Sequence, residues 1–137
     1  MYRTDLQKLA RVRLREAKAL AAAGLHDGAY YLAGYAVECA LKACIAKATL
    51  RHEFPDKARA IASHTHDLSA LVKLAQLEGA RRVLVRTDGE FDRNWGIVEE
   101  WSEQSRYQSL GPEQARDLIR AIADPRHGVL PWVARFW

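Results

Sequence analysis

The chain has 137 residues, 49% of them apolar and 28% charged, a composition that excludes a disordered chain and predicts one globular domain over residues 1–137. The net charge of +4, with fifteen arginines among 21 basic side chains, permits a nucleic acid partner without requiring one. No apolar run reaches membrane-spanning length, and the charged N-terminus lacks the apolar region of a signal peptide. We therefore expect a cytoplasmic protein with no membrane contact.

Helical periodicity recurs along the chain and no segment alternates with the period of a strand, so the sequence predicts an all-α bundle of about five helices. The first helix is predicted over residues 4–23 and is ended by Gly24. Its leucines and alanines share one arc. The opposite arc carries four basic residues, which are Lys8, Arg11, Arg15 and Lys18.

The second helix is predicted to begin after an N-cap at Asp27 and to include residues 30–47, "YYLAGYAVECALKACIAK". Apolar side chains cover nearly its whole circumference, so it should be the central helix of the bundle or face a partner chain on one side. Cys39 and Cys44 lie about 140° apart on this helix, because each residue turns the helix by 100°. We expect both to be buried, reduced thiols.

The rest of the chain predicts shorter helices joined by polar connections. Thr65 or Asp67 begins a third helix, which Gly79 ends. Pro112 suits the first position of a late helix. The further elements expected are two short helices near 80–87 and 91–101, a loop over 102–111, a helix over 113–123 and a last amphipathic turn or two over 129–137.

One carboxylate interrupts the apolar second helix. Glu38 shares a narrow stripe with Tyr31, Tyr35 and Lys42, so two hydroxyl groups and an ammonium are within its reach. Arg13 lies in the apolar arc of the first helix and could meet Glu38 if the two helices form an antiparallel hairpin. The buried polar cluster has two interpretations, which are a structural salt bridge and the polar floor of a binding groove.

A second group of polar residues, "SHTHDL", contains His64 and His66. Two histidines at positions i and i+2 do not share a helix face, and no other cluster supplies the further ligands of a structural zinc site. We expect no metal and no cofactor. One of the histidines is expected to cap or pack at the start of the third helix.

The segment "NWGIVEEWSEQSRY" places Arg106 and Tyr107 in a polar loop before the last helices. Arg106 can pair with one of three nearby glutamates, Glu99, Glu100 and Glu103. Alternatively, its guanidinium can take a nucleotide or RNA phosphate bidentately while the ring of Tyr107 stacks on a base.

Four stretches in this order resemble the HEPN (higher eukaryotes and prokaryotes nucleotide-binding) superfamily, namely "YYLAGYAVECALKA", "HDLSALVKLA", "NWGIVEEWSEQSRY" and "GVLPWVARFW". The resemblance implies a bundle of four or five helices that is commonly a dimer. It further implies one of three roles: an RNA-cleaving toxin, a partner of a minimal nucleotidyltransferase in a toxin–antitoxin pair, or a non-catalytic binding module.

The ribonuclease motif of that superfamily is an arginine, usually followed by a polar residue, and then a histidine after four to six positions, near the start of a late helix. Arg59 stands at this spacing from His64 and His66, but Ala60 follows it and the location is early in the chain. Arg93–Asn94 and Arg106–Tyr107 lie later in the chain. We find no suitable histidine after either pair, so ribonuclease activity is left open.

The interpretation that follows is an HEPN-like domain that binds RNA or a nucleotide, or a nucleotidyltransferase-like protein, without clear catalytic residues. The binding residues expected are Arg93, Asn94, Arg106 and Tyr107. The alternatives are a metal-independent ribonuclease toxin and a purely structural helical dimer. A homodimer is expected because the second helix is apolar on more sides than a five-helix bundle covers easily.

Overall fold

The computed structural model describes residues 2–50 and 62–137, with the side chains of Leu50 and Arg106 left out of the description. These residues form seven α-helices and one 3₁₀ helix, with no strand among them. The all-α prediction is confirmed, and the expected count of about five helices is too low. The short elements account for the difference. α4 (Leu68–Leu74) has only seven residues, and α8 (Val129–Ala134), which was expected as a turn or two, is a helix of six residues.

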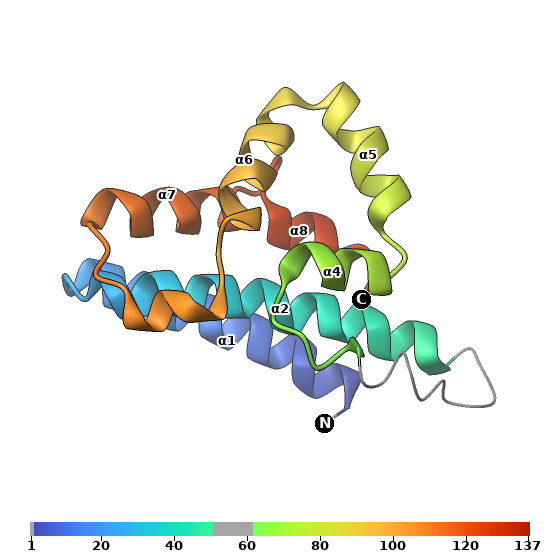
Figure 1. Cartoon of the computed structure of the whole chain (residues 1–137), viewed down its shortest axis with the longest axis horizontal. Helices are drawn as coiled ribbons and strands as arrows, with labels where there is room; N and C mark the ends of the chain where they lie inside the picture. The colour runs from blue at the N-terminus through green and yellow to red at the C-terminus, as the bar shows by residue number, and fades with distance from the viewer. Residues whose placement is uncertain (1, 51–61) are drawn as a thin grey trace.

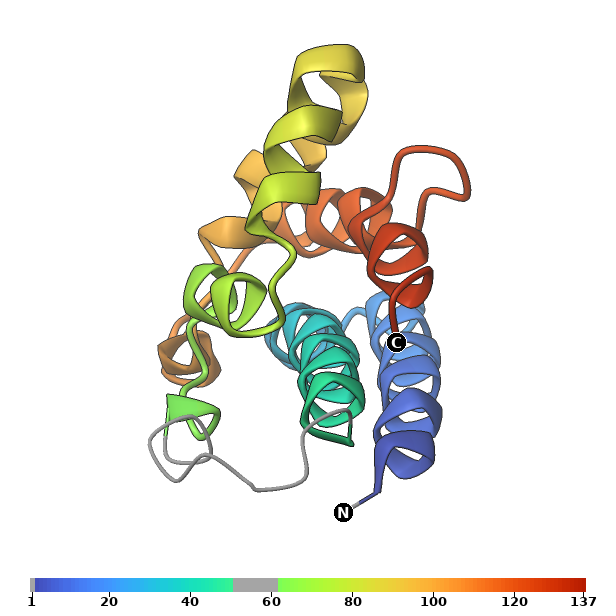
Figure 2. The ribbon, with the colours of Figure 1, turned by 90° about the vertical axis from the view of Figure 1, so that its right-hand side faces the viewer.

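The two longest helices lie side by side and run in opposite directions (Figures 1 and 2). They are α1 (Arg3–Ala22) and α2 (His26–Leu50), joined by a turn in which Gly24 has a φ of 81°. That left-handed conformation is accessible to glycine without strain, which explains why the chain reverses there. Asp27 is not the N-cap, because α2 begins at His26. The carboxylate of Asp27 instead accepts the backbone N–H of Leu110 at 2.6 Å.

The predicted central position of α2 matches the structure. Its buried apolar side chains join one core with those of α4, α6, α7 and α8. Cys39 and Cys44 are both free thiols inside this core. Close packing also explains Gly34, since a Cβ there would lie 2.2 Å from the indole ring of Trp101.

The middle of the chain departs from the prediction at one boundary. Asp67 caps α4 by accepting the N–H of Ala70, but the helix ends at Leu74 rather than near Gly79. The reversal is made by Gln76, whose φ is 62°. Gly79 instead lies in the first turn of α5 (Glu78–Thr87).

The last elements close the bundle over the α1–α2 pair. Asp88 caps α6 (Gly89–Glu99), and the expected loop contains a 3₁₀ helix, η1 (Glu103–Tyr107). Pro112 opens α7 (Pro112–Ala123), as predicted. α7 and α8 lie along the α1–α2 pair, whereas α5 and α6 project away from it (Figures 1 and 2). Within the described ranges, no helix has the length and apolar character needed to cross a bilayer.

Candidate functional site

The most buried charge in the described chain is the carboxylate of Glu38, which is 2% exposed. Its Oε2 accepts a hydrogen bond from Lys42 Nζ at 3.1 Å, and its Oε1 lies 2.9 Å from His66 Nδ1. The other ring nitrogen of His66, Nε2, lies 3.4 Å from Glu103 Oε2. We call these four residues, Lys42, Glu38, His66 and Glu103, the Glu38 cluster.

Local sequence explains how three separate elements meet in the Glu38 cluster. Lys42 follows Glu38 by one helical turn on α2. The N-cap of Asp67 fixes the start of α4, and the N–H of Asp67 donates to Thr65 Oγ1 at 3.2 Å. That turn holds His66 over α2, while η1 supplies Glu103.

The geometry of His66 limits what it can do chemically. Both of its ring nitrogens face a carboxylate, one buried and one partly exposed. These two contacts join the turn before α4 to α2 and to η1. A general base needs a ring nitrogen free to reach the substrate proton, so the arrangement suits a structural bridge between elements better than a general base.

Arg13 does not take part in the Glu38 cluster. Its guanidinium pairs instead with Glu16, three residues along α1. The tyrosines of the predicted stripe pack as rings: Tyr31 and Tyr35 are stacked with centroids 6.2 Å apart, and Tyr31 lies 6.1 Å from the ring of Trp101. Burial raises the pKa of Tyr35 above its usual value, so its hydroxyl stays protonated at neutral pH.

The predicted binding residues fall into two places. Tyr107 is on η1, the element that supplies Glu103, and is 72% exposed. Arg93 is exposed on α6. Asn94, its neighbour, is half-buried and donates from Nδ2 to the carbonyl of His127 at 2.9 Å. The side chain of Arg106 lies outside the described parts of the structure, so these four residues remain a prediction.

The candidate catalytic pairs have separate outcomes. Arg59 lies outside the described residues, so its distance to either histidine is not defined. His64 is exposed, whereas His66 is held in the Glu38 cluster. In the part of the chain that the structure describes, no group of histidine, cysteine and carboxylate side chains has an arrangement that could hold a metal ion.

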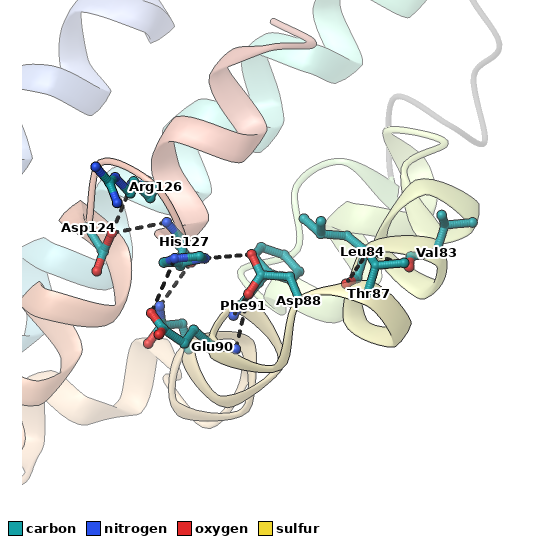
Figure 3. A network of polar contacts seen from close by, with 10 residues as sticks. Val83, Leu84, Thr87, Asp88, Glu90, Phe91, Asp124, Arg126 and His127 are labelled. Atoms are coloured by element: carbon teal, nitrogen blue, oxygen red, sulfur yellow. Dashed lines mark hydrogen bonds and ion pairs between the residues drawn. The ribbon is translucent and has the colours of Figure 1, made fainter.

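A second histidine cluster, centred on His127, was missed by the sequence analysis (Figure 3). His127 Nδ1 lies 2.7 Å from Asp88 Oδ2 and Nε2 lies 3.3 Å from Glu90 Oε2. The carboxylate of Asp124 accepts the backbone N–H groups of Arg126 and His127. The turn between α7 and α8 is thereby tied to the N-terminus of α6, where Asp88 also accepts two backbone N–H groups.

Electrostatics in this second cluster favour an ionised pair. The hydrogen bond from His127 holds the pKa of Asp88 below its usual value. The same bond to Asp88 raises the pKa of His127, and the nearby carboxylates of Glu90 and Asp124 add to this effect. The imidazole is therefore stabilised in its protonated form.

One sequence signal could have identified His127. Six residues separate Arg120 from His127, which is the spacing of the ribonuclease motif, and the sequence analysis considered only Arg59, Arg93 and Arg106. The structure does not join the two side chains as a pair. Arg120 is 71% exposed with its guanidinium 4.0 Å from Asp117, and His127 faces Asp88 and Glu90. Ala121 also occupies the position where a polar residue is usual.

Comparison with known proteins gives one positive result. No curated protein and no solved structure matches the chain significantly. A family model described as the HEPN domain matches residues 4–127. The match covers most of the 137 residues, including α1, α2 and the helices that hold both histidine clusters. The chain therefore belongs to the HEPN domain family.

Proposed function

We propose that this HEPN domain binds RNA or a nucleotide and does not cleave RNA by itself. One observation carries the non-catalytic part: both ring nitrogens of His66 and both ring nitrogens of His127 are directed at carboxylates. Each imidazole would have to leave at least one of these contacts before a ring nitrogen could take the proton of a ribose 2′-hydroxyl.

The binding part is supported by the exposure of Tyr107 on η1. An exposed aromatic ring can stack on a base irrespective of its identity, and such stacking contributes about 1–3 kcal/mol per base. Arg93, Asn94 and Arg106 are the further binding residues proposed, with the guanidinium groups directed at phosphates.

The test combines binding and cleavage on the purified chain. Fluorescence anisotropy with a labelled mixed-sequence RNA, and with a labelled nucleotide, should show binding by the wild type. Tyr107→Ala should weaken RNA binding by roughly 5-fold to 150-fold. The matched variant Tyr107→Phe keeps the ring and should bind as the wild type does.

Two results would reject the proposal. The first is the absence of binding to both RNA and nucleotide. The second is RNA cleavage by the wild type that is lost in His64→Ala, His66→Ala or His127→Ala, which would establish the ribonuclease alternative instead.

The α5 helix supports a second candidate function, the docking of a protein partner. None of its residues is fully buried, and Val83 is 63% exposed on a helix that projects from the bundle (Figure 1). The partner proposed is a second copy of the chain or a nucleotidyltransferase-like protein. Light scattering should give twice the 15.5 kDa chain mass for a homodimer. Val83→Asp should abolish association, and Ile97→Asp, at another exposed apolar residue, should leave it unchanged.

A further inference from the structure

The positive charge of the molecule is concentrated on one helix. α1 carries six basic side chains (Arg3, Lys8, Arg11, Arg13, Arg15 and Lys18) and two acidic ones (Asp5 and Glu16), a net charge of +4. The whole chain has 21 basic and 17 acidic residues, so the part outside α1 has fifteen of each and is neutral. The excess charge of the protein is therefore equal to that of α1.

Four of these cations form a continuous line, which we call the α1 stripe. Lys8, Arg11, Arg15 and Lys18 follow one another by three, four and three residues, which places them within an arc of about 80°. All four side chains are exposed. On the opposite side of the helix, Ala10 and Ala17 are fully buried in the core.

The carboxylates of α1 do not neutralise the stripe. Glu16 pairs with Arg13, and Asp5 accepts the backbone N–H of Tyr2 at 3.1 Å. Among the described residues, no ion pair joins a member of the α1 stripe to an acidic side chain of another element. Four cations thus face solvent together, which is unfavourable for the isolated protein and favours binding of a polyanion.

Arg11 has a defined position within the stripe. Its guanidinium lies over the ring of Trp137, 4.7 Å from the ring centroid. This cation–π contact holds the charged end of Arg11 beside Trp137 and orders the side chain. An ordered guanidinium loses less conformational entropy when it contacts a phosphate.

We propose that the α1 stripe binds the phosphate backbone of RNA. The proposal rests on the proposed function and places its main electrostatic contact on α1, away from η1. Lys18 is the tenth residue after Lys8, and a rise of 1.5 Å per residue makes the stripe about 15 Å long, enough to follow several successive phosphates.

The composition of the exposed arc favours a nucleic acid backbone over a protein surface or a membrane. Besides the four cations it contains only small residues, such as Thr4 and Ala22, so it lacks the large apolar side chains that form the centre of a protein interface. A membrane surface would need the apolar face of the helix to insert, and that face is buried against the bundle.

The test is the salt dependence of RNA binding. The variant Lys8→Gln, Arg11→Gln, Arg15→Gln, Lys18→Gln removes the stripe, and its circular dichroism checks that it is folded. A matched control removes four exposed cations on other elements, namely Lys73, Arg82, Arg86 and Arg126, each replaced by glutamine. Both variants therefore have the same net charge.

Four phosphate contacts predict that log K falls with log[salt] at a slope of about −2.8 for single-stranded RNA. The slope for the stripe variant should be smaller by about this amount, and the variant should bind RNA more than 10-fold more weakly than the wild type. The control variant should match the wild type in both slope and affinity. Equal losses in both variants would show that only net charge matters and would overturn the inference. Polyglutamate bound as tightly as RNA would also overturn it.

Three further outcomes separate the failure of this inference from the failure of the function on which it rests. If the stripe variant binds RNA as the wild type does, the inference fails and the RNA-binding function stands. If the wild type binds a mononucleotide but no RNA, the inference fails and the function stands on the nucleotide. If it binds neither, the proposed function fails as well.

Discussion

Gly34 is a position where one added methyl group should have a large effect on the fold. In Gly34→Ala the new Cβ would lie 2.2 Å from three atoms of the Trp101 indole ring, against an ordinary contact of 3.4–4 Å. The ring must move by more than 1 Å. It is 3% exposed and packs against Tyr31, so there is no free space to receive it. Overpacking of this kind costs about 1–3 kcal/mol.

The helix propensity of alanine opposes that cost, because Gly→Ala inside a helix contributes about 1 kcal/mol of stability. We expect the upper end of the packing cost, and hence a net loss of about 2 kcal/mol in the free energy of unfolding.

Gly96→Ala is the matched control, since no atom lies within 4 Å of a Cβ at that helical position. It should gain roughly 0.5–1 kcal/mol. Urea unfolding followed by circular dichroism measures both variants. A Gly34→Ala variant as stable as Gly96→Ala would refute the account of how α2 packs against Trp101.

Three further predictions follow from the polar and thiol groups. Glu38→Ala should lower the free energy of unfolding, measured in urea, by about 1–3 kcal/mol. The loss is smaller than for a fully buried pair because the side chains of Lys42 and His66 are 24% and 42% exposed. A change below about 0.5 kcal/mol would contradict this expectation. The raised pKa of His127 predicts a contribution to stability that is fully present below about pH 6.5, its pKa in the unfolded chain, and is lost as the pH rises through the higher pKa of the folded state. Urea unfolding of the wild type and of His127→Asn at pH 6 and pH 9 should show that the variant lacks this loss. A variant with the same pH dependence as the wild type would refute the prediction. Burial raises the pKa of Cys39 to about 11 and that of Cys44 to about 12, so neither thiol should react readily at pH 8 until urea unfolds the chain, and fast labelling of the native protein would be inconsistent with their burial.

Local rules account for much of the fold because they act within one or two helical turns. The N-cap of Asp67, the start of α7 at Pro112 and the pairing of Glu38 with Lys42 all depend on residues at most four apart. The end of α4 was misplaced because glycine is the usual residue in a left-handed C-terminal turn, and here Gln76 adopts that conformation instead.

The histidine contacts could not be predicted because their partners are distant in the sequence. His66 meets Glu38 across 28 residues and His127 meets Asp88 across 39. Each contact depends on how two helices are placed in three dimensions, which periodicity within a helix does not determine. The expected contact of Arg13 with Glu38 also depended on how α1 and α2 are placed, and the guanidinium pairs instead with Glu16, three residues away on its own helix.

The concentration of charge on α1 restricts how two copies of the chain can assemble. A dimer with two-fold symmetry places the same surface of each copy against itself. A dimer interface through the α1 stripe would place the four cations of one copy against the same four of the other. A homodimer should therefore use another face, such as α5 with its exposed Val83. Both stripes would then remain outside the interface, and one long RNA could bind them together with greater avidity than either alone.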